Sequence, residues 1–257
     1  MMFDIGSASH IGKVRQRNED CYLVRPDAGL WAVADGMGGH EAGDLASQIV
    51  IGELRLVGIP DSATDLLEMC EERLALANMR LKDIGRERGG VIVGATVALL
   101  LAFGDYYACV WAGDSRIYVV RDGKIIQLSQ DHTELEDLLA QGVVTREEAR
   151  TWHAANALTR AIGVSDEAEL EITSGPLMSG DTFVICSDGL TRHVTDEEIL
   201  QHVETEASQV ACDSLVALTL ERGASDNVTL IVVRRLPDSA HVDASMGCDG
   251  PGFGGPS

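Results

Sequence analysis

Near-continuous runs of apolar residues occur at intervals along the chain and predict β-strands. Strands that are buried on both faces lose the usual alternation of apolar and polar residues. The pair Asp122-Gly123 predicts a two-residue hairpin turn, and Gly104-Asp105 predicts a second one. The predicted strands are Leu30–Ala34, Ile92–Phe103, Tyr106–Trp111, Arg116–Val120, Lys124–Leu128, Thr182–Cys186 and Val228–Val233.

Helices are predicted where apolar residues recur every three or four positions. Shorter stripes of this kind begin at Leu45 and at Ala211, and a longer one stops before Gly85, a residue type that often ends helices. Helices and hairpins alternate without regular strand–helix–strand units, so we expect an α+β fold with antiparallel sheets. The longer stripe consists of Leu66, Cys70, Leu74, Ala77, Leu81 and Ile84.

The composition changes once along the chain, at Pro237. Residues 237–257 are rich in Gly, Pro and Ser and contain few apolar residues, so they predict a disordered tail. Residues 1–236 show neither a linker nor an internal repeat. We therefore expect one domain over 1–236, followed by the tail.

Carboxylates stand at the ends of several predicted strands. A single Asp-Gly pair is typical of a turn, but five segments that each place an acid at a strand end indicate a cluster. Two like charges 4 Å apart cost about 4 kcal/mol at an effective dielectric near 20, so cations are expected among them, and all-oxygen ligands favour Mg²⁺ or Mn²⁺. The acids are Glu19 with Asp20, Asp35, Asp114, Asp188 and Asp226.

The charge balance and the cysteines narrow the class of protein. The chain has 41 acidic and 20 basic residues, a net charge of −21, which disfavours binding to nucleic acid or to an anionic membrane. It has no apolar run long enough to cross a bilayer, and its first ten residues contain an acid and no apolar segment of the kind found in signal peptides, so no signal peptide is expected. The six cysteines show no metal-site spacing. Reduced thiols in a cytoplasmic protein fit this pattern.

The motifs, taken in order, resemble those of the metal-dependent serine/threonine protein phosphatases of type 2C, in their bacterial branch. The glycine-rich loops of nucleotide-binding proteins and the nucleophile elbow of hydrolases are both missing from the sequence. The resemblance covers about residues 3–235. It rests on Val14–Asp20, Ala34–Gly43, Gly94–Thr96, Ala112–Arg116, Leu158–Gly163, Cys186–Leu190 and Ser225–Thr229.

The resemblance implies a fold and a reaction. The fold is a four-layer α-β-β-α sandwich of two antiparallel sheets, with a dinuclear metal cleft at one end and a helical flap at about residues 131–156. The implied reaction is hydrolysis of phosphoserine and phosphothreonine in proteins, by a hydroxide that bridges two tightly bound Mn²⁺ or Mg²⁺ ions. No phosphoenzyme is implied, so no cysteine or serine nucleophile is needed.

The resemblance also assigns roles to individual residues. Asp35 is similar to the carboxylate that bridges both ions. The carbonyl of Gly36 and, through water, Glu19 are implied to hold one ion. Asp188 and Asp226 are implied to hold the other. The remaining two assignments are phosphate binding by Arg15 and a weaker third ion at Asp114.

The sequence departs from the family pattern at two positions. Many eukaryotic members carry histidine where this chain has Met37, and methionine cannot donate a proton to the leaving group. His40 is the candidate acid in its place, with a metal-bound water as the rival. Many members also carry aspartate at the position of Arg192. An arginine there cannot bind a metal and would repel one nearby, so a weak third site is expected. The side chain could instead point outward, or pair with Asp114 and occupy the third site electrostatically.

Two other functions stay open beside the phosphatase reading. One is a catalytically inactive relative that binds phosphoproteins, and the other is an acidic protein that buffers cations. Manganese-dependent hydrolysis of a phosphopeptide separates all three. For a phosphatase we expect a monomer whose partners are phosphorylated proteins, including a serine/threonine kinase and its substrates. The short chain is also similar to stand-alone regulators, some of which are tied to type VI secretion.

Overall fold

The strands of the protein form two antiparallel sheets, as seen in a computed structural model that describes residues 2–38, 42–149 and 157–237. The first sheet has the order β1-β11-β10-β7-β8, and the second has the order β2-β3-β5-β6-β9, with β4 paired to β3. The first sheet contains β1 (Phe3–His10), β7 (Arg116–Arg121), β8 (Lys124–Gln127), β10 (Thr182–Cys186) and β11 (Val228–Arg235). The second contains β2 (Asp20–Arg25), β3 (Leu30–Met37), β4 (Gly94–Ala95), β5 (Val97–Phe103), β6 (Tyr106–Ala112) and β9 (Glu171–Pro176).

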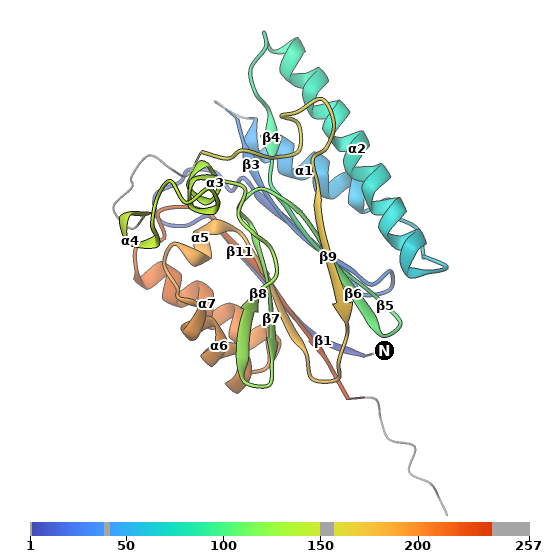
Figure 1. Cartoon of the computed structure of the whole chain (residues 1–257), viewed down its shortest axis with the longest axis vertical. Helices are drawn as coiled ribbons and strands as arrows, with labels where there is room; N and C mark the ends of the chain where they lie inside the picture. The colour runs from blue at the N-terminus through green and yellow to red at the C-terminus, as the bar shows by residue number, and fades with distance from the viewer. Residues whose placement is uncertain (1, 39–41, 150–156, 238–257) are drawn as a thin grey trace, which may run out of the picture.

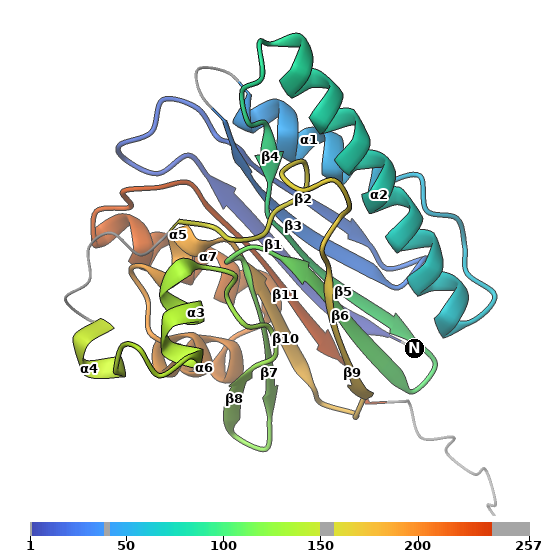
Figure 2. The same cartoon turned by 45° about the horizontal axis from the view of Figure 1, so that its top comes forward.

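Helices cover the outer face of each sheet (Figures 1 and 2). Helices α1 and α2 pack on the second sheet, while α5, α6 and α7 pack on the first. The short helices α3 and α4 lie near α5, at one end of the sandwich. The helix bounds are α1 (Gly43–Leu54), α2 (Ala63–Glu87), α3 (Glu134–Ala140), α4 (Arg146–Ala149), α5 (Asp188–Thr191), α6 (Asp196–Thr205) and α7 (Ser208–Glu221).

The central core lies between the two sheets. Trp31 of β3 is fully buried there and meets the ring of Phe3 edge-on, with 5.0 Å between the centroids. Tyr107 and Phe183 make a similar contact across the sheets. Separate apolar clusters lie under the helices on either side. The predicted four-layer α-β-β-α arrangement of two antiparallel sheets is confirmed.

Local signals in the sequence formed the expected elements in most places. Asp122 and Gly123 both have positive φ, as the predicted hairpin turn requires. Helix α2 begins after the cap Ser62, whose side chain accepts a hydrogen bond from the backbone N–H of Asp65. It continues past the predicted stop at Gly85 to Glu87.

Several strands differ from the predictions. The run predicted as one strand over Ile92–Phe103 is divided at Thr96, which donates its backbone N–H to Asp35 O at 2.8 Å. Strands β1 and β9 were not predicted because their residues are largely polar or small. Strand β9 lies at a sheet edge and exposes alternate residues, so it needs little apolar sequence.

The domain boundaries stay predictions. The tail expected over 237–257 lies outside the described residues from residue 238 onward, and so does part of the expected flap, residues 150–156. No helix in the described part of the chain is both long and apolar enough to cross a bilayer.

Candidate functional site

The predicted acids meet in one cavity at the end of the sandwich. The cavity has a volume of about 270 Å³. Strand β3 brings Asp35, the segment before β11 brings Asp226, and Asp188 begins α5 directly after β10. The remaining acids of the wall are Glu19 and Asp114. Segments that are far apart in the sequence thus bring five carboxylates together, as the strand-end pattern predicts.

Asp35 stands at the centre of the like charges. Its backbone N–H donates to the hydroxyl of Thr96 at 3.0 Å, and that hydroxyl lies 2.8 Å from the hydroxyl of Ser115. Burial raises the pKa of Asp35 well above its usual value, and the charges of the surrounding aspartates raise it further. The same two causes raise the pKa of Asp114 and Asp188. The ionised forms of these carboxylates are therefore costly unless a proton or a cation relieves the repulsion.

Glycines allow the backbone to pass close to this cluster. A Cβ atom at Gly36 would collide with the carbonyl of Gly43, at the start of α1. A Cβ atom at Gly43 would collide in turn with the carboxylate of Glu19. The backbone N–H of Gly36 also donates to Glu19 O at 3.0 Å. The end of β3, the start of α1 and the segment before β2 can therefore approach one another only because these positions lack side chains.

Asp20 joins the cluster, as the strand-end pattern expects, although the sequence assigned it no role at the site. It lies opposite Asp35 in the β2–β3 register. Ser187 donates its hydroxyl to Asp20 Oδ2 at 2.8 Å and receives the backbone N–H of Thr229 at 3.0 Å. Burial raises the pKa of Asp20. The position of Asp20 beside Glu19, at the start of a strand, indicates that it belongs to the acid cluster. Only the strand register shows that it lies opposite Asp35.

Two arginines lie among the acids. Arg15 donates to Asp226 Oδ2 at 2.8 Å and lies 4.0 Å from Glu19 Oε2, while about half of its side chain is exposed at the mouth of the cavity. Arg192 donates to the same Asp226 oxygen at 3.0 Å and forms an ion pair with Asp188. Arg192 therefore neither points outward nor pairs with Asp114, the two positions considered from the sequence.

The donor set fits hard divalent cations. All of the clustered acids offer oxygen, the ligand atom that Mg²⁺ and Mn²⁺ prefer. The buried Oδ1 atoms of Asp20 and Asp188 have no hydrogen-bond partner in the described structure. Within those residues, no three acidic, histidine or cysteine side chains already surround a single point. Arginines occupy one oxygen of each of two acids instead. Arg15 and Arg192 both contact Asp226 Oδ2, and Arg192 also contacts Asp188 Oδ2.

The described part of the expected flap borders the site, whereas the predicted proton donor lies outside the described residues. Leu135 and Leu139 of α3 line a second cavity of about 190 Å³, whose wall also includes Asp114, Asp188 and Arg192. The described part of the flap thus lies beside the carboxylate cluster. His40, the candidate proton donor, falls in residues 39–41, outside the described residues.

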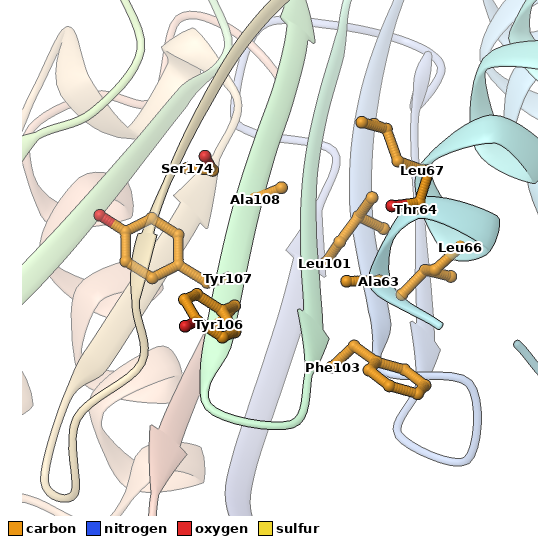
Figure 3. Close-up of a pocket in the computed structure, with 10 residues that line it drawn as sticks. All are labelled: Ala63, Thr64, Leu66, Leu67, Leu101, Phe103, Tyr106, Tyr107, Ala108 and Ser174. Atoms are coloured by element: carbon orange, nitrogen blue, oxygen red, sulfur yellow. The ribbon is translucent and has the colours of Figure 1, made fainter. Parts of the chain in front are cut away.

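A cavity of different character lies at the other end of β5 and β6 (Figure 3). Its volume is also about 270 Å³. Apart from two tyrosines, none of its lining residues is ionisable, so it holds no carboxylate, histidine or cysteine that could bind a metal ion. The lining residues are Ala63, Thr64, Leu66, Leu67, Leu101, Phe103, Tyr106, Tyr107, Ala108 and Ser174.

Comparison with known proteins places this geometry in a family. The family model described as protein phosphatase 2C matches residues 7–228. The chain is 35% identical over 222 residues to the serine/threonine protein phosphatase PstP of Mycobacterium tuberculosis. That match covers 86% of this chain and 43% of PstP, so the chain spans less than half the length of that relative.

Solved structures agree in fold and in sequence. The structure titled "PppA, a key regulatory component of T6SS in Pseudomonas aeruginosa" superposes with a TM-score of 0.83 at 39% identity, over 91% of this chain and 98% of that one. The catalytic domain of PstP, solved in complex with two manganese ions, gives 0.82 at 33% identity, over 91% and 99% of the chains. The family match, these likenesses and the shared order of motifs agree: the chain belongs to the protein phosphatase 2C family.

Proposed function

We propose that this protein is a Mn²⁺- or Mg²⁺-dependent phosphatase that hydrolyses phosphoserine and phosphothreonine in proteins. The observation that carries the proposal is the meeting of five carboxylates in one cavity, with an unpartnered buried oxygen on Asp188. Membership of the protein phosphatase 2C family supports the reaction class. PstP, solved with two manganese ions, supports the choice of metal.

The residues present fit two ions. Asp35 would be shared by both, the Gly36 carbonyl and Glu19 would serve one, and Asp188 with Asp226 would serve the other. When bound, the ions neutralise the carboxylates and supply Lewis-acid activation of water for attack on phosphorus. We also propose a weaker third ion at Asp114, which lies in the same cavity.

The chain's own residues orient the substrate. Arg15 stands at the mouth of the cavity, where its planar guanidinium suits two phosphate oxygens. Thr96 fixes the backbone of Asp35 through two hydrogen bonds, so the carboxylate keeps its place during the reaction. His40 stays the proposed proton donor to the leaving alkoxide.

The substrate class implies a preceding reaction. A phosphoserine or phosphothreonine must first be made by a serine/threonine kinase, so we propose such a kinase and its targets as the partners. We propose that the protein acts as a monomer in the cytoplasm. The free state of every described cysteine supports that compartment, namely Cys21, Cys70, Cys109, Cys186 and Cys212.

Hydrolysis of a phosphothreonine peptide tests the proposal directly. The purified protein should release phosphate with Mn²⁺ or Mg²⁺ and stop when chelator is in excess. Alkylation of accessible thiols is the matched control, and it should change the rate little because no cysteine lines the cavity. Activity that persists in excess chelator would contradict the two-metal site. Binding of the phosphopeptide without hydrolysis would favour the inactive, phosphoprotein-binding alternative.

A further inference from the structure

Arg192 contacts both carboxylates that the proposed function assigns to the second ion. Its guanidinium donates to Asp226 Oδ2 at 3.0 Å through one terminal nitrogen and pairs with Asp188 Oδ2 through the other. Asp226 Oδ2 also receives Arg15 at 2.8 Å. The fork of a single arginine thus spans the two acids, which a point charge would not do.

The local backbone explains why Arg192 reaches this position. Helix α5 is one turn long and begins with Asp188. Arg192 follows that turn as its C-cap, with its backbone N–H donated to Asp188 O at 3.0 Å. Side chains four residues apart lie on the same side of a helical turn. The guanidinium therefore extends back along the turn toward the carboxylate of Asp188.

The oxygens of these two acids are unequally engaged. Asp226 Oδ1 receives the backbone N–H of Asn227 at 2.9 Å, and its Oδ2 receives two arginines. Asp188 Oδ2 pairs with Arg192, while its Oδ1 is buried without a partner. A cation that needs one oxygen from each acid therefore meets Arg192 as a direct competitor.

The side chain of Arg192 can also move away from the two acids into solvent. Its side chain is 39% exposed, and it lies on the wall of both the carboxylate cavity and the flap cavity. A guanidinium at such a boundary can leave the two acids without being buried elsewhere, because the side chain is long and its head is already partly in water. Displacement therefore does not require any other described element to unfold.

We propose that Arg192 is an internal counter-cation that competes with the second ion for Asp188 and Asp226. The proposal rests on the proposed function, because it takes the second ion to bind at those acids. Arg192 stabilises the carboxylate cluster when divalent metal is scarce. The same contact raises the metal concentration that is needed to fill the second position, so Arg192 sets the range over which the protein responds to metal.

Metal titration and unfolding of three variants test this role without any substrate. Calorimetry with MnCl₂ compares the unaltered protein with Arg192→Gln, Arg192→Lys and Arg86→Gln. The last variant is the matched control. Arg86 is an exposed arginine on α2 that pairs with Asp83, and its substitution by Gln removes the same charge as Arg192→Gln. Thermal unfolding of each protein is followed in excess chelator and at saturating Mn²⁺.

Arg192→Gln should bind the weaker of the two ions at least about fivefold more tightly, because a competing unit charge within a few ångströms is removed. In chelator its unfolding midpoint should fall by about 4 °C or more, and saturating Mn²⁺ should abolish that deficit. Arg192→Lys should lie between, since lysine keeps the charge but lacks the fork. Arg86→Gln should change Mn²⁺ affinity less than twofold.

The outcomes separate this inference from the proposed function. Unchanged Mn²⁺ affinity in Arg192→Gln, or an equal change in Arg86→Gln, would overturn the role of Arg192. If the affinity shift appears but no variant hydrolyses a phosphopeptide, the role of Arg192 stands and the proposed function fails. A protein that binds no Mn²⁺ would overturn both.

Discussion

The two ends of β5 and β6 carry cavities of equal size and opposite chemistry. Strand β6 runs from Tyr106, in the wall of the apolar cavity, to Ala112, two residues before Asp114 in the carboxylate cavity. Each cavity has a volume of about 270 Å³. At one end the sandwich gathers like charges that destabilise the fold unless cations join them. At the other end it gathers mostly apolar side chains and no carboxylate.

This difference separates residues that serve the reaction from residues that serve the fold. Neutral substitutions of the acids at the carboxylate end should change turnover strongly and leave stability in chelator intact or even raised, because they relieve repulsion. Substitutions at the apolar end should change stability and leave the turnover of the folded protein unchanged. The charges and unpartnered polar atoms of a cavity therefore indicate whether it takes part in the reaction, and its volume does not.

The largest expected effect is at Asp35. Asp35→Asn should lower kcat at least about 10³-fold, roughly 4 kcal/mol of barrier, because it removes the acid that is proposed to bind both ions. The stability of the protein in chelator should not fall. Steady-state kinetics on a phosphothreonine peptide with saturating Mn²⁺ measures the first effect, and urea unfolding measures the second. A variant that keeps half of the normal turnover would show that the assignment is wrong.

The opposite pattern is expected at Leu101, in the wall of the apolar cavity. Its side chain is only 3% exposed, so Leu101→Ala should cost about 2–5 kcal/mol of unfolding free energy by enlarging a cavity. The kcat of the fraction that stays folded should remain within about twofold. Urea unfolding and kinetics at low temperature check both parts. A loss of kcat as large as that of Asp35→Asn would contradict the proposal that the apolar end serves stability alone.

A smaller effect is expected at the third-ion position. Asp114→Ala should lower kcat about 10-fold, about 1.4 kcal/mol of barrier. It should leave the two tight ions in place, because their proposed ligands are other residues. Calorimetry with MnCl₂ counts the tight sites, with Asp35→Asn as the contrasting variant that loses them. Three tight ions in the unaltered protein would contradict a weak third position.

The smallest effect is expected at Tyr106. Its side chain is 65% exposed although it borders the apolar cavity, so Tyr106→Ser should change the unfolding free energy by no more than about 0.5 kcal/mol. Turnover should not change. Chemical denaturation provides the measurement. A cost above about 1.5 kcal/mol would show that Tyr106 is buried in solution, and the apolar cavity would then be closed rather than open.

The sequence predicts the site better than it predicts the contacts within it. Asp35 and Asp188 each precede glycine after a buried apolar run, so their convergence followed from the positions of the strand ends. The partners of Arg192 did not follow, because they depend on the path of a side chain after a single helical turn. Asp20 was listed with the clustered acids but given no role for a similar reason, since only the strand register places it opposite Asp35.

The fold shows the same limit. Strands rich in apolar residues, such as β10, were predicted with the right bounds, because a strand that is buried on both faces consists of a continuous apolar run. Strand β1 has few apolar residues and pairs only with β11, at the edge of the sheet, so its sequence carries a weaker strand signal. The interruption at Thr96 was also missed, because it depends on hydrogen bonds to β3.

The pairing of β1 with β11 has a consequence for synthesis on the ribosome. Phe3 lies opposite Arg235 and His10 lies opposite Val228, so the first strand waits for nearly the whole described chain before it finds its partner. At about 5–20 residues per second this delay is roughly 10–45 seconds. Asp226 lies just before β11, so the carboxylate cluster is also completed last. Nascent chains that stop before β11 should therefore neither complete the first sheet nor bind the proposed second ion. The protein then responds to metal only after β11 has been synthesised.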